Sequence, residues 1–167
     1  MTVYTTTDSP LGELLLVAEE GSGGVSLTSV TFSGQKTSMA VQDGRRRDAA
    51  AFTEITGQLE AYFTGQLQRF DVEYTSNGTP FQERVWAALR EIPYGSITTY
   101  GKVAEQIGAS QDRIRAVGAA IGANPLLIIA PCHRVIGANG SLTGYAGGVE
   151  RKRSLLTLEG ALQPMFS

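Results

Sequence analysis

The chain has 167 residues, of which 42% are hydrophobic and 18% are charged, and its formal net charge is −2. This length and composition are typical of one globular domain or two small ones, and they exclude a large multidomain enzyme. With one cysteine and one histidine, the chain forms no internal disulfide and lacks the three or four ligands of a usual zinc site, which excludes a disulfide scaffold and a zinc module.

The first half of the chain is predicted to be rich in strands. Residues 14–18 form a short apolar run and residues 25–32 alternate in part, with a glycine-rich turn between them, so we expect an antiparallel meander. Residues 33–47 are polar and end in three arginines, which indicates a solvated loop and, only weakly, a phosphate contact. Apolar residues recur at helical spacing over residues 48–63, and residues 70–74 are predicted to form one more strand.

A predicted linker at residues 75–78 separates a strand-rich domain, residues 1–76, from a second domain, residues 79–167. The two parts also differ in net charge. Residues 1–76 hold 5 basic and 10 acidic side chains, whereas residues 77–167 hold 9 basic and 6 acidic ones, an excess of +3. This excess permits contact with an anionic polymer through a local face. The pI near 5.4 argues against broad, non-specific binding of nucleic acid.

The second domain is predicted to be mostly helical. Thr79 and Gln82 form a capping box at the start of a helix that ends before the Ile-Pro-Tyr-Gly segment. A short helix over residues 99–106 and a third over residues 111–123, behind a Ser110 cap, are joined by a tight connection that contains glycine. Two short helices connected in this way are typical of a helix-turn-helix.

The third predicted helix consists almost entirely of small residues after Arg115, and two of them are glycines. Each glycine costs about 1 kcal/mol in the interior of a helix, so another group must approach this backbone closely. Close packing against a neighbouring helix explains the pattern. A recognition helix that enters a groove of DNA, with Arg115 near its start, explains it equally well.

The only cysteine and the only histidine are adjacent, at Cys132 and His133, directly after an apolar run. A buried, unreactive cysteine is one interpretation, and a nucleophile whose pKa is lowered by a nearby imidazole or cation is the other. Neighbours in an extended segment point to opposite sides, so proton transfer between them requires a turn or a bridging water. The adjacency argues against an ordinary cysteine hydrolase, in which the two partners come from distant parts of the sequence.

The segments around this pair resemble a known family. Similarity to the O6-alkylguanine-DNA alkyltransferases, also called methylated-DNA:protein-cysteine methyltransferases, is carried by four segments. They are Asn124-Pro125, the Pro-Cys-His-Arg-Val-Ile-Gly segment at 131–137, the Gly-Tyr-Ala-Gly-Gly segment at 144–148 and a last helix with Arg151-Lys152-Arg153 through Leu155-Leu156 to Glu159-Gly160. The resemblance covers nearly all of residues 79–167. It implies an α/β (α+β) fold, with a small antiparallel sheet and a helix of ribonuclease H-like type, followed by a mostly helical domain with a winged-helix-like helix-turn-helix.

The resemblance also implies an activity. Cys132 is expected to take the alkyl group from O6-alkylguanine in DNA, once per molecule and without a metal or other cofactor. His133 is expected to act as the base through a water, with Glu159 as its orienting partner and Asn124 as the brace of the active-site loop. The target nucleotide must be flipped, since an O6 group inside a base-paired stack cannot meet a buried thiol.

Further residues are implied to bind the substrate or DNA. Tyr100 is expected to donate to the guanine ring, and Arg115 to fill the gap that the flipped nucleotide leaves. The carbonyls of Cys132 and Val135 are expected to accept from the guanine amino group. The remaining residues of this implied set are Arg134, Tyr145, which forms a wall of the pocket, and Ala146, whose amide faces O6.

The implied partner is double-stranded DNA carrying the lesion, bound through the minor groove by a monomer, with cooperative binding and repair of O4-methylthymine left open. Leu127 and Thr143 stand where some relatives have smaller or differently shaped residues, so we expect poor reaction with bulky adducts such as benzyl. No run approaches the roughly 20 apolar residues of a membrane span, and residues 1–8 lack the features of a signal peptide. We therefore expect a cytoplasmic protein with no membrane contact.

Three other functions agree less well with these residues. Alkyltransferase-like proteins that mark lesions without repairing them generally lack the acceptor cysteine, whereas Cys132 is present here with His133, Tyr100 and Glu159. A cysteine hydrolase is disfavoured by the adjacency of Cys132 and His133. A sequence-specific regulator is disfavoured because a helix of small residues with one arginine has few groups for reading bases.

Overall fold

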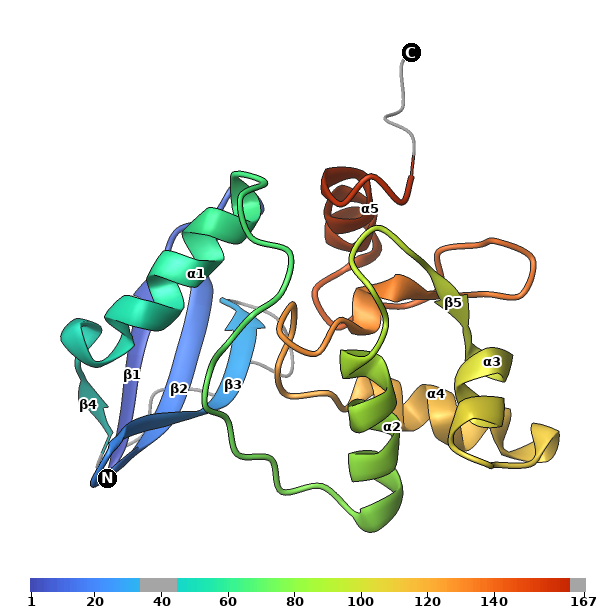
Figure 1. The fold of residues 1–167 in the computed structure, drawn as a ribbon, viewed down its shortest axis with the longest axis horizontal. Coiled ribbons are helices and arrows are strands. Elements are labelled where there is room, and N and C mark those ends of the chain that lie inside the picture. The colour runs from blue at the N-terminus through green and yellow to red at the C-terminus, as the bar shows by residue number, and fades with distance from the viewer. Residues whose placement is uncertain (34–44, 163–167) are drawn as a thin grey trace. The chain divides into compact units, whose positions relative to one another are not determined.

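The computed structural model describes residues 1–33 and 45–162. It divides into two compact units, Met1–Ser76 and Asn77–Ser167, which are considered separately (Figure 1). Within the described ranges, no helix is both long enough and apolar enough to cross a bilayer. The predicted α/β fold, with a small sheet in the first unit and a mostly helical second unit, is confirmed.

The first unit is built on a four-stranded sheet with the order β3-β2-β1-β4. Its strands are β1 (Thr2–Thr7), β2 (Leu14–Gly21), β3 (Gly24–Phe32) and β4 (Arg46–Arg47). Strands β2 and β3 pair antiparallel from Leu14↔Phe32 to Gly21↔Gly24, which confirms the predicted meander. Strand β1 pairs antiparallel with β2 and was not predicted, because its threonine-rich sequence does not alternate clearly between apolar and polar residues.

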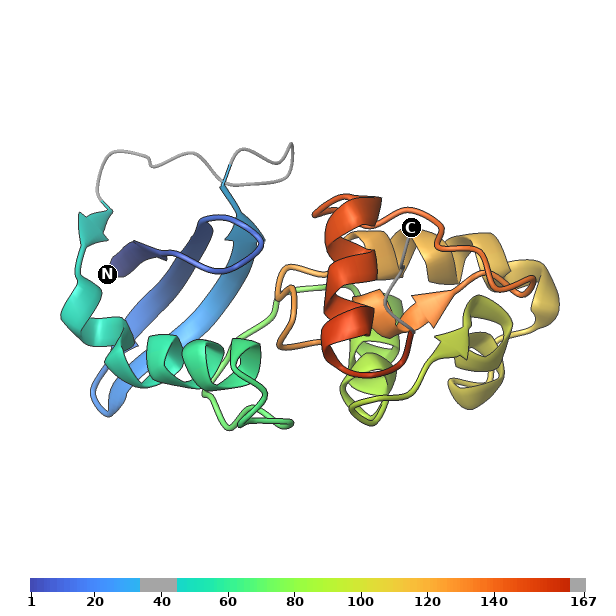
Figure 2. The same cartoon turned by 90° about the horizontal axis from the view of Figure 1, so that it is seen from above.

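A helix packs on this sheet. Helix α1 (Thr53–Phe63) follows a short 3₁₀ helix (Ala49–Phe52) that is capped by Asp48, whose carboxylate accepts from the amide of Ala51. Figures 1 and 2 show α1 lying along one face of the sheet. Its buried residues are Ile55, Leu59 and Tyr62, at helical spacing, as the sequence predicts for this segment.

Two predictions for the first unit are corrected. Arg46 and Arg47 form β4 beside β1 rather than a solvated loop, and Arg46 pairs with the carboxylates of Glu20 at 2.9 Å and Asp48 at 3.1 Å. Residues 34–44 of that predicted loop lie outside the described residues. The predicted strand at 70–74 is wrong, because only Tyr74 forms an isolated bridge, to Leu27.

The second unit contains four helices and two short strands within the described residues. They are α2 (Pro80–Arg90), β5 (Thr98–Thr99), α3 (Tyr100–Gln106), α4 (Ile114–Gly122), β6 (Val135–Ile136) and α5 (Val149–Leu158). The capping box is confirmed, since Thr79 Oγ1 accepts from the amide of Gln82 and Gln82 Oε1 accepts from the amide of Thr79. The indole of Trp86 donates to the carbonyl of Ala120 at 2.8 Å and so joins α2 to α4.

Helices α3 and α4 form the predicted helix-turn-helix, with one difference. The third helix begins at Ile114, after a short 3₁₀ helix at Gln111–Arg113. Ser110 precedes this 3₁₀ helix, but its hydroxyl donates to the carboxylate of Asp112 instead of capping a backbone amide. Ser110 therefore occupies the predicted N-cap position, but its side chain does not make the capping bond.

Candidate active site

A parallel strand pair brings distant parts of the second unit together. Strand β5 pairs with β6 through Thr98↔Val135 and Thr99↔Ile136. Tyr100 directly follows β5, and a 3₁₀ turn at Cys132–Arg134 directly precedes β6. This pairing places Tyr100 and Cys132 on the wall of one cavity, although they are far apart in sequence.

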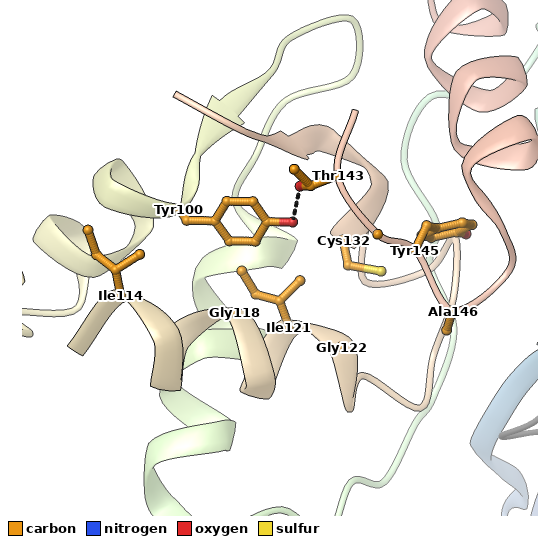
Figure 3. Close-up of a pocket in the computed structure, with 10 residues that line it drawn as sticks. Tyr100, Ile114, Gly118, Ile121, Gly122, Cys132, Thr143, Tyr145 and Ala146 are labelled. Atoms are coloured by element: carbon orange, nitrogen blue, oxygen red, sulfur yellow. Dashed lines mark hydrogen bonds between the residues drawn. The ribbon is translucent and has the colours of Figure 1, made fainter. Parts of the chain in front are cut away.

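The cavity has a volume of about 410 Å³ and is shown in Figure 3. Its walls are Tyr100, the α4 residues Ile114, Gly118, Ile121 and Gly122, the thiol-bearing Cys132, and the loop residues Thr143, Gly144, Tyr145 and Ala146. The α4 residues recur at helical spacing, so one face of α4 borders the cavity. The close approach expected at the glycines of α4 is not seen among the described residues, because a Cβ at Gly118 would make an ordinary 3.9 Å contact with the Tyr100 ring and a Cβ at Gly122 would meet nothing within 4 Å.

Asn124 fixes the loop that leads to Cys132. Its buried side-chain amide donates to the carbonyls of Ala130 at 2.8 Å and Leu126 at 3.4 Å, and its Oδ1 accepts from the Leu126 amide at 3.0 Å. Within this loop Ile128 has φ +72°, a strained conformation for a β-branched residue. Asn124 therefore holds a strained backbone in the shape that presents Cys132 to the cavity.

The residues Cys132, His133 and Arg134 form a single 3₁₀ turn rather than an extended segment. Proton transfer between the adjacent side chains of Cys132 and His133 requires a turn or a bridging water, and the structure supplies the turn. His133 is completely buried, and its Nε2 lies 2.7 Å from Oε2 of Glu159, the residue that directly follows α5 as its C-cap. The same carboxylate accepts from Nε of Arg134 at 2.8 Å and from Nη2 at 3.0 Å.

These contacts fix the protonation of His133. Burial lowers the pKa of the imidazole, and the neighbouring Glu159 opposes this change without overcoming it, so His133 is neutral near pH 7. The Glu159 carboxylate accepts from the Arg134 guanidinium, so the proton of the neutral ring lies on Nε2 and faces Glu159. Nδ1 is then unprotonated, and among the described residues it is buried without a hydrogen-bond partner. It can accept a proton.

Cys132 is a buried thiol, 5% exposed. Burial raises the pKa of its thiol from about 9.0 to about 11, while a hydrogen bond from Asn124 and the positive charge of Lys152 act in the opposite direction. Lys152 is itself buried, and its Nζ donates to the carbonyl of Thr143 at 2.9 Å. At neutral pH Cys132 is therefore protonated and needs a base before it can act as a nucleophile.

We expect the reactivity of Cys132 toward iodoacetamide to follow this raised pKa. Because the thiolate is the reactive form, the rate should increase about tenfold per pH unit up to a pH of about 11 in the folded protein. The same chain unfolded in urea should level off near pH 9, the ordinary value. Mass spectrometry of quenched samples measures both profiles. A folded-state plateau at or below pH 9 contradicts the predicted environment of the thiol.

The other expected site residues lie on the cavity wall or on the surface near it. The hydroxyls of Tyr100 and Thr143 are joined at 2.8 Å. Arg115 is exposed near the start of α4, and Ala146 is exposed in the loop that borders the cavity. Tyr145 also borders the cavity; its hydroxyl is buried with no hydrogen-bond partner among the described residues, and burial raises its pKa.

The expectations for Arg134 and Leu127 change with the structure, whereas that for the Val135 carbonyl does not. Arg134 is buried, with its guanidinium on Glu159 and on the carbonyl of Ile92 at 2.6 Å, so its position does not support the expected DNA contact. Val135 is completely buried in β6, where only its backbone could meet a ligand. Leu127 is buried and does not line the cavity, whereas Thr143 does.

Lys152 was not predicted as a site residue. A lysine at a helix position that faces the core, three residues before the buried Leu155, is the signal that could have identified it. For metals, the part of the chain that is described contains no group of three or more His, Cys, Asp or Glu side chains placed to hold an ion.

The chain matches known proteins along almost its whole length. Residues 2–75 match the family description "6-O-methylguanine DNA methyltransferase, ribonuclease-like domain", and residues 80–161 match "6-O-methylguanine DNA methyltransferase, DNA binding domain". A methylated-DNA–protein-cysteine methyltransferase of Mycobacterium tuberculosis is 51% identical over 161 residues, 96% of this chain and 94% of that protein. One from Methanosarcina acetivorans is 48% identical over 158 residues, 95% of this chain and 98% of that protein.

Solved structures agree with these matches. The crystal structure of M. tuberculosis OGT in complex with DNA is 50% identical, with a TM-score of 0.85, and the match covers 95% of this chain and 93% of that one. The crystal structure of M. tuberculosis O6-methylguanine methyltransferase is 49% identical, with a TM-score of 0.86, over 98% and 96% of the two chains. This chain belongs to the family of methylated-DNA–protein-cysteine methyltransferases.

Proposed function

We propose that this protein repairs O6-methylguanine in DNA by transferring the methyl group to Sγ of its own Cys132. The observation that carries the proposal is the position of Cys132, which lines the cavity while its neighbour in the turn, His133, presents a bare ring nitrogen oriented by Glu159. Membership of a family named for transfer to a protein cysteine supports the same reaction. Nucleophile, base and orienting carboxylate follow the logic of a catalytic triad.

The reaction needs no other reactant. His133 accepts the Cys132 proton at Nδ1, through a water, and the thiolate attacks the methyl carbon in line with the bond to O6. The sulfur–carbon bond forms as the carbon–oxygen bond breaks. Guanine leaves with the electron pair and takes up the proton released by the thiol, so the methyl group and the proton exchange places.

The substrate must reach the cavity as a flipped nucleotide, because the methyl group of a stacked base cannot approach a buried sulfur. Helix α4 borders the cavity and carries the exposed Arg115 near its start, which suits insertion into the duplex. The hydroxyl of Tyr100 faces the cavity from α3 and donates to the guanine ring. The carbonyl of Val135, the ring of Tyr145 and the amide of Ala146 complete the contacts to the base. Binding is through the minor groove, where readout is degenerate, so the lesion and not the sequence around it is recognised.

Stoichiometry tests this function. A cysteine thioether has no ready leaving path, so each molecule should repair one lesion and stop. With a duplex containing one O6-methylguanine in excess over protein, the recovered guanine should reach a plateau at one per protein molecule, measured by chromatography of the hydrolysed DNA. Continued turnover, or lesion binding with no guanine recovered, contradicts the proposal.

The rate of transfer should depend on the size of the alkyl group. Thr143 borders the cavity and its hydroxyl is hydrogen-bonded to that of Tyr100, so we expect this wall to obstruct a benzyl group more than a methyl group. We expect transfer from O6-benzylguanine in the same duplex to be at least about tenfold slower than from O6-methylguanine, since overpacking a formed cavity costs about 1–3 kcal/mol. Single-turnover rates on the two duplexes measure this difference. Equal rates contradict it.

We propose that the protein acts in the cytoplasm and that it acts as a monomer. The reaction requires Cys132 as a free thiol, which a reducing compartment preserves, and Cys132 is a free cysteine in the structure. The site residues that the family resemblance implies are all present in this one chain, which supports activity as a monomer.

A further inference from the structure

The hydroxyls of Tyr100 and Thr143 meet across the cavity. Tyr100 is the first residue of α3, whereas Thr143 lies in the loop between β6 and α5, and the two oxygens are 2.8 Å apart. Figure 3 shows the Tyr100 ring reaching toward Thr143 above Gly118 and Ile121 of α4. The bond therefore joins two walls of the site that are separate in sequence.

Thr143 is held firmly on its own side of the cavity. Its carbonyl accepts from Nζ of Lys152, which is only 1% exposed and belongs to α5, and its amide donates to the carbonyl of Ser141 at 3.1 Å. Hydrogen bonds to a charged donor are stronger than those between neutral groups. The Thr143 hydroxyl is therefore placed by the backbone and by a buried amine, and does not depend on Tyr100 for its position.

Without the hydrogen bond to Thr143, Tyr100 would be held only at its backbone end. Its backbone begins α3, where the side chain of Thr99 accepts from the amide of Lys102, and its ring packs near Gly118. The hydroxyl end projects into the cavity, and its contact in the structure is Thr143. Loss of that contact leaves the phenol free to move relative to the base.

We infer that Thr143 is a positioning residue for Tyr100 during methyl transfer, an inference that rests on the proposed function. A hydroxyl donates one hydrogen bond and accepts two. When Thr143 donates to Oη of Tyr100, the Tyr100 proton is directed away from Thr143 and toward the guanine ring. Thr143 thus aligns the donor, and the resulting chain of hydroxyls strengthens the bond that the base receives.

A double-mutant cycle tests this inference in the full-length protein. Thr143→Val keeps the shape and removes the hydroxyl, Thr143→Ser keeps the hydroxyl, and Tyr100→Phe removes the group that Thr143 is inferred to align. Single-turnover rate constants are measured on a duplex containing O6-methylguanine, and urea unfolding of each variant confirms that it is folded. Thr143 is exposed, so these changes leave the buried core intact.

Thr143→Val is expected to lower the second-order rate constant about 2- to 10-fold, the range for one lost hydrogen bond, and Thr143→Ser to stay within about twofold of wild type. In the Tyr100→Phe background, Thr143→Val should have an effect of less than about twofold, because its target is absent. Full additivity of the two changes, or equal rates for the valine variant and wild type, overturns the inference. If wild type recovers no guanine at all, the proposed function itself has failed, and this outcome is separate.

Discussion

Replacing Glu159 with glutamine is expected to reduce both the stability of the protein and the rate of methyl transfer. The carboxylate accepts from the imidazole of His133 and twice from the guanidinium of Arg134, inside the fold. Removing its charge leaves Arg134 buried without a counter-ion, which costs about 3–5 kcal/mol of the free energy of unfolding. The pKa of His133 falls further without the nearby carboxylate, so the base is weaker as well as less well oriented.

The rate of methyl transfer in Glu159→Gln should fall by up to about 10²- to 10⁴-fold, the usual contribution of a general base such as His133, which Glu159 orients. Urea unfolding followed by circular dichroism measures the first effect, and single-turnover repair measures the second. Glu150→Gln is the matched control, because Glu150 is exposed in the first turn of the same helix and its change should cost less than about 1 kcal/mol. Equal losses in the two variants contradict the assigned role of Glu159.

Asn124→Ala is expected to have the second large effect. The substitution leaves the buried amide of Leu126 without its partner and removes one of the bonds to the Ala130 carbonyl, at a cost of about 2–4 kcal/mol in the free energy of unfolding. The strained backbone at Ile128 also loses its restraint and can relax. Since Cys132 follows this loop directly, the sulfur moves out of line with the methyl carbon.

A displacement of about 1 Å at a reacting atom costs roughly 10²-fold in rate, and we expect a loss of that order for Asn124→Ala. Single-turnover repair under conditions where the variant is fully folded separates this effect from instability. Asn77→Ala, at an exposed asparagine in the same unit, serves as control and should match wild type in both measurements. A folded Asn124→Ala protein with the wild-type rate shows that Asn124 is not needed to place the thiol.

Local sequence signals predicted most helices because the responsible contacts lie within a few residues. Thr79 and Gln82 are three residues apart, and their capping box is formed as expected. The same holds for the helical spacing of Ile55, Leu59 and Tyr62 in α1. These patterns depend on neighbours along the chain, so the sequence contains them directly.

The strands were predicted less completely because their partners are distant. Arg46 and Arg47 form β4 only because β1, more than 40 residues earlier, offers an unpaired edge. The segment at 70–74 has the composition of a strand, yet its pairing is limited to an isolated bridge between Tyr74 and Leu27, in which the Leu27 amide donates to the carbonyl of Glu73. Tertiary pairing therefore decided both cases against the local propensity.

In the candidate site, too, features of neighbouring residues were predicted from the sequence, and contacts between distant residues were predicted less well. The adjacency of Cys132 and His133 is visible in the sequence, and the family resemblance pointed to Glu159 as the partner of His133, which the 2.7 Å contact now shows. The resemblance implies a DNA contact for Arg134, but Glu159, 25 residues further along the chain, pairs with the guanidinium inside the fold. Such a contact depends on the packing of α5 against the Cys132 turn, which no local pattern contains.

The mass of the intact protein after incubation with a duplex containing one O6-methylguanine shows whether Cys132 accepts the methyl group. We predict a gain of one methylene mass per molecule, located on the peptide that contains Cys132, and no gain in a Cys132→Ala control. A lesion bound tightly with no change in mass, or a methyl group found on any other residue, shows that Cys132 is not the acceptor.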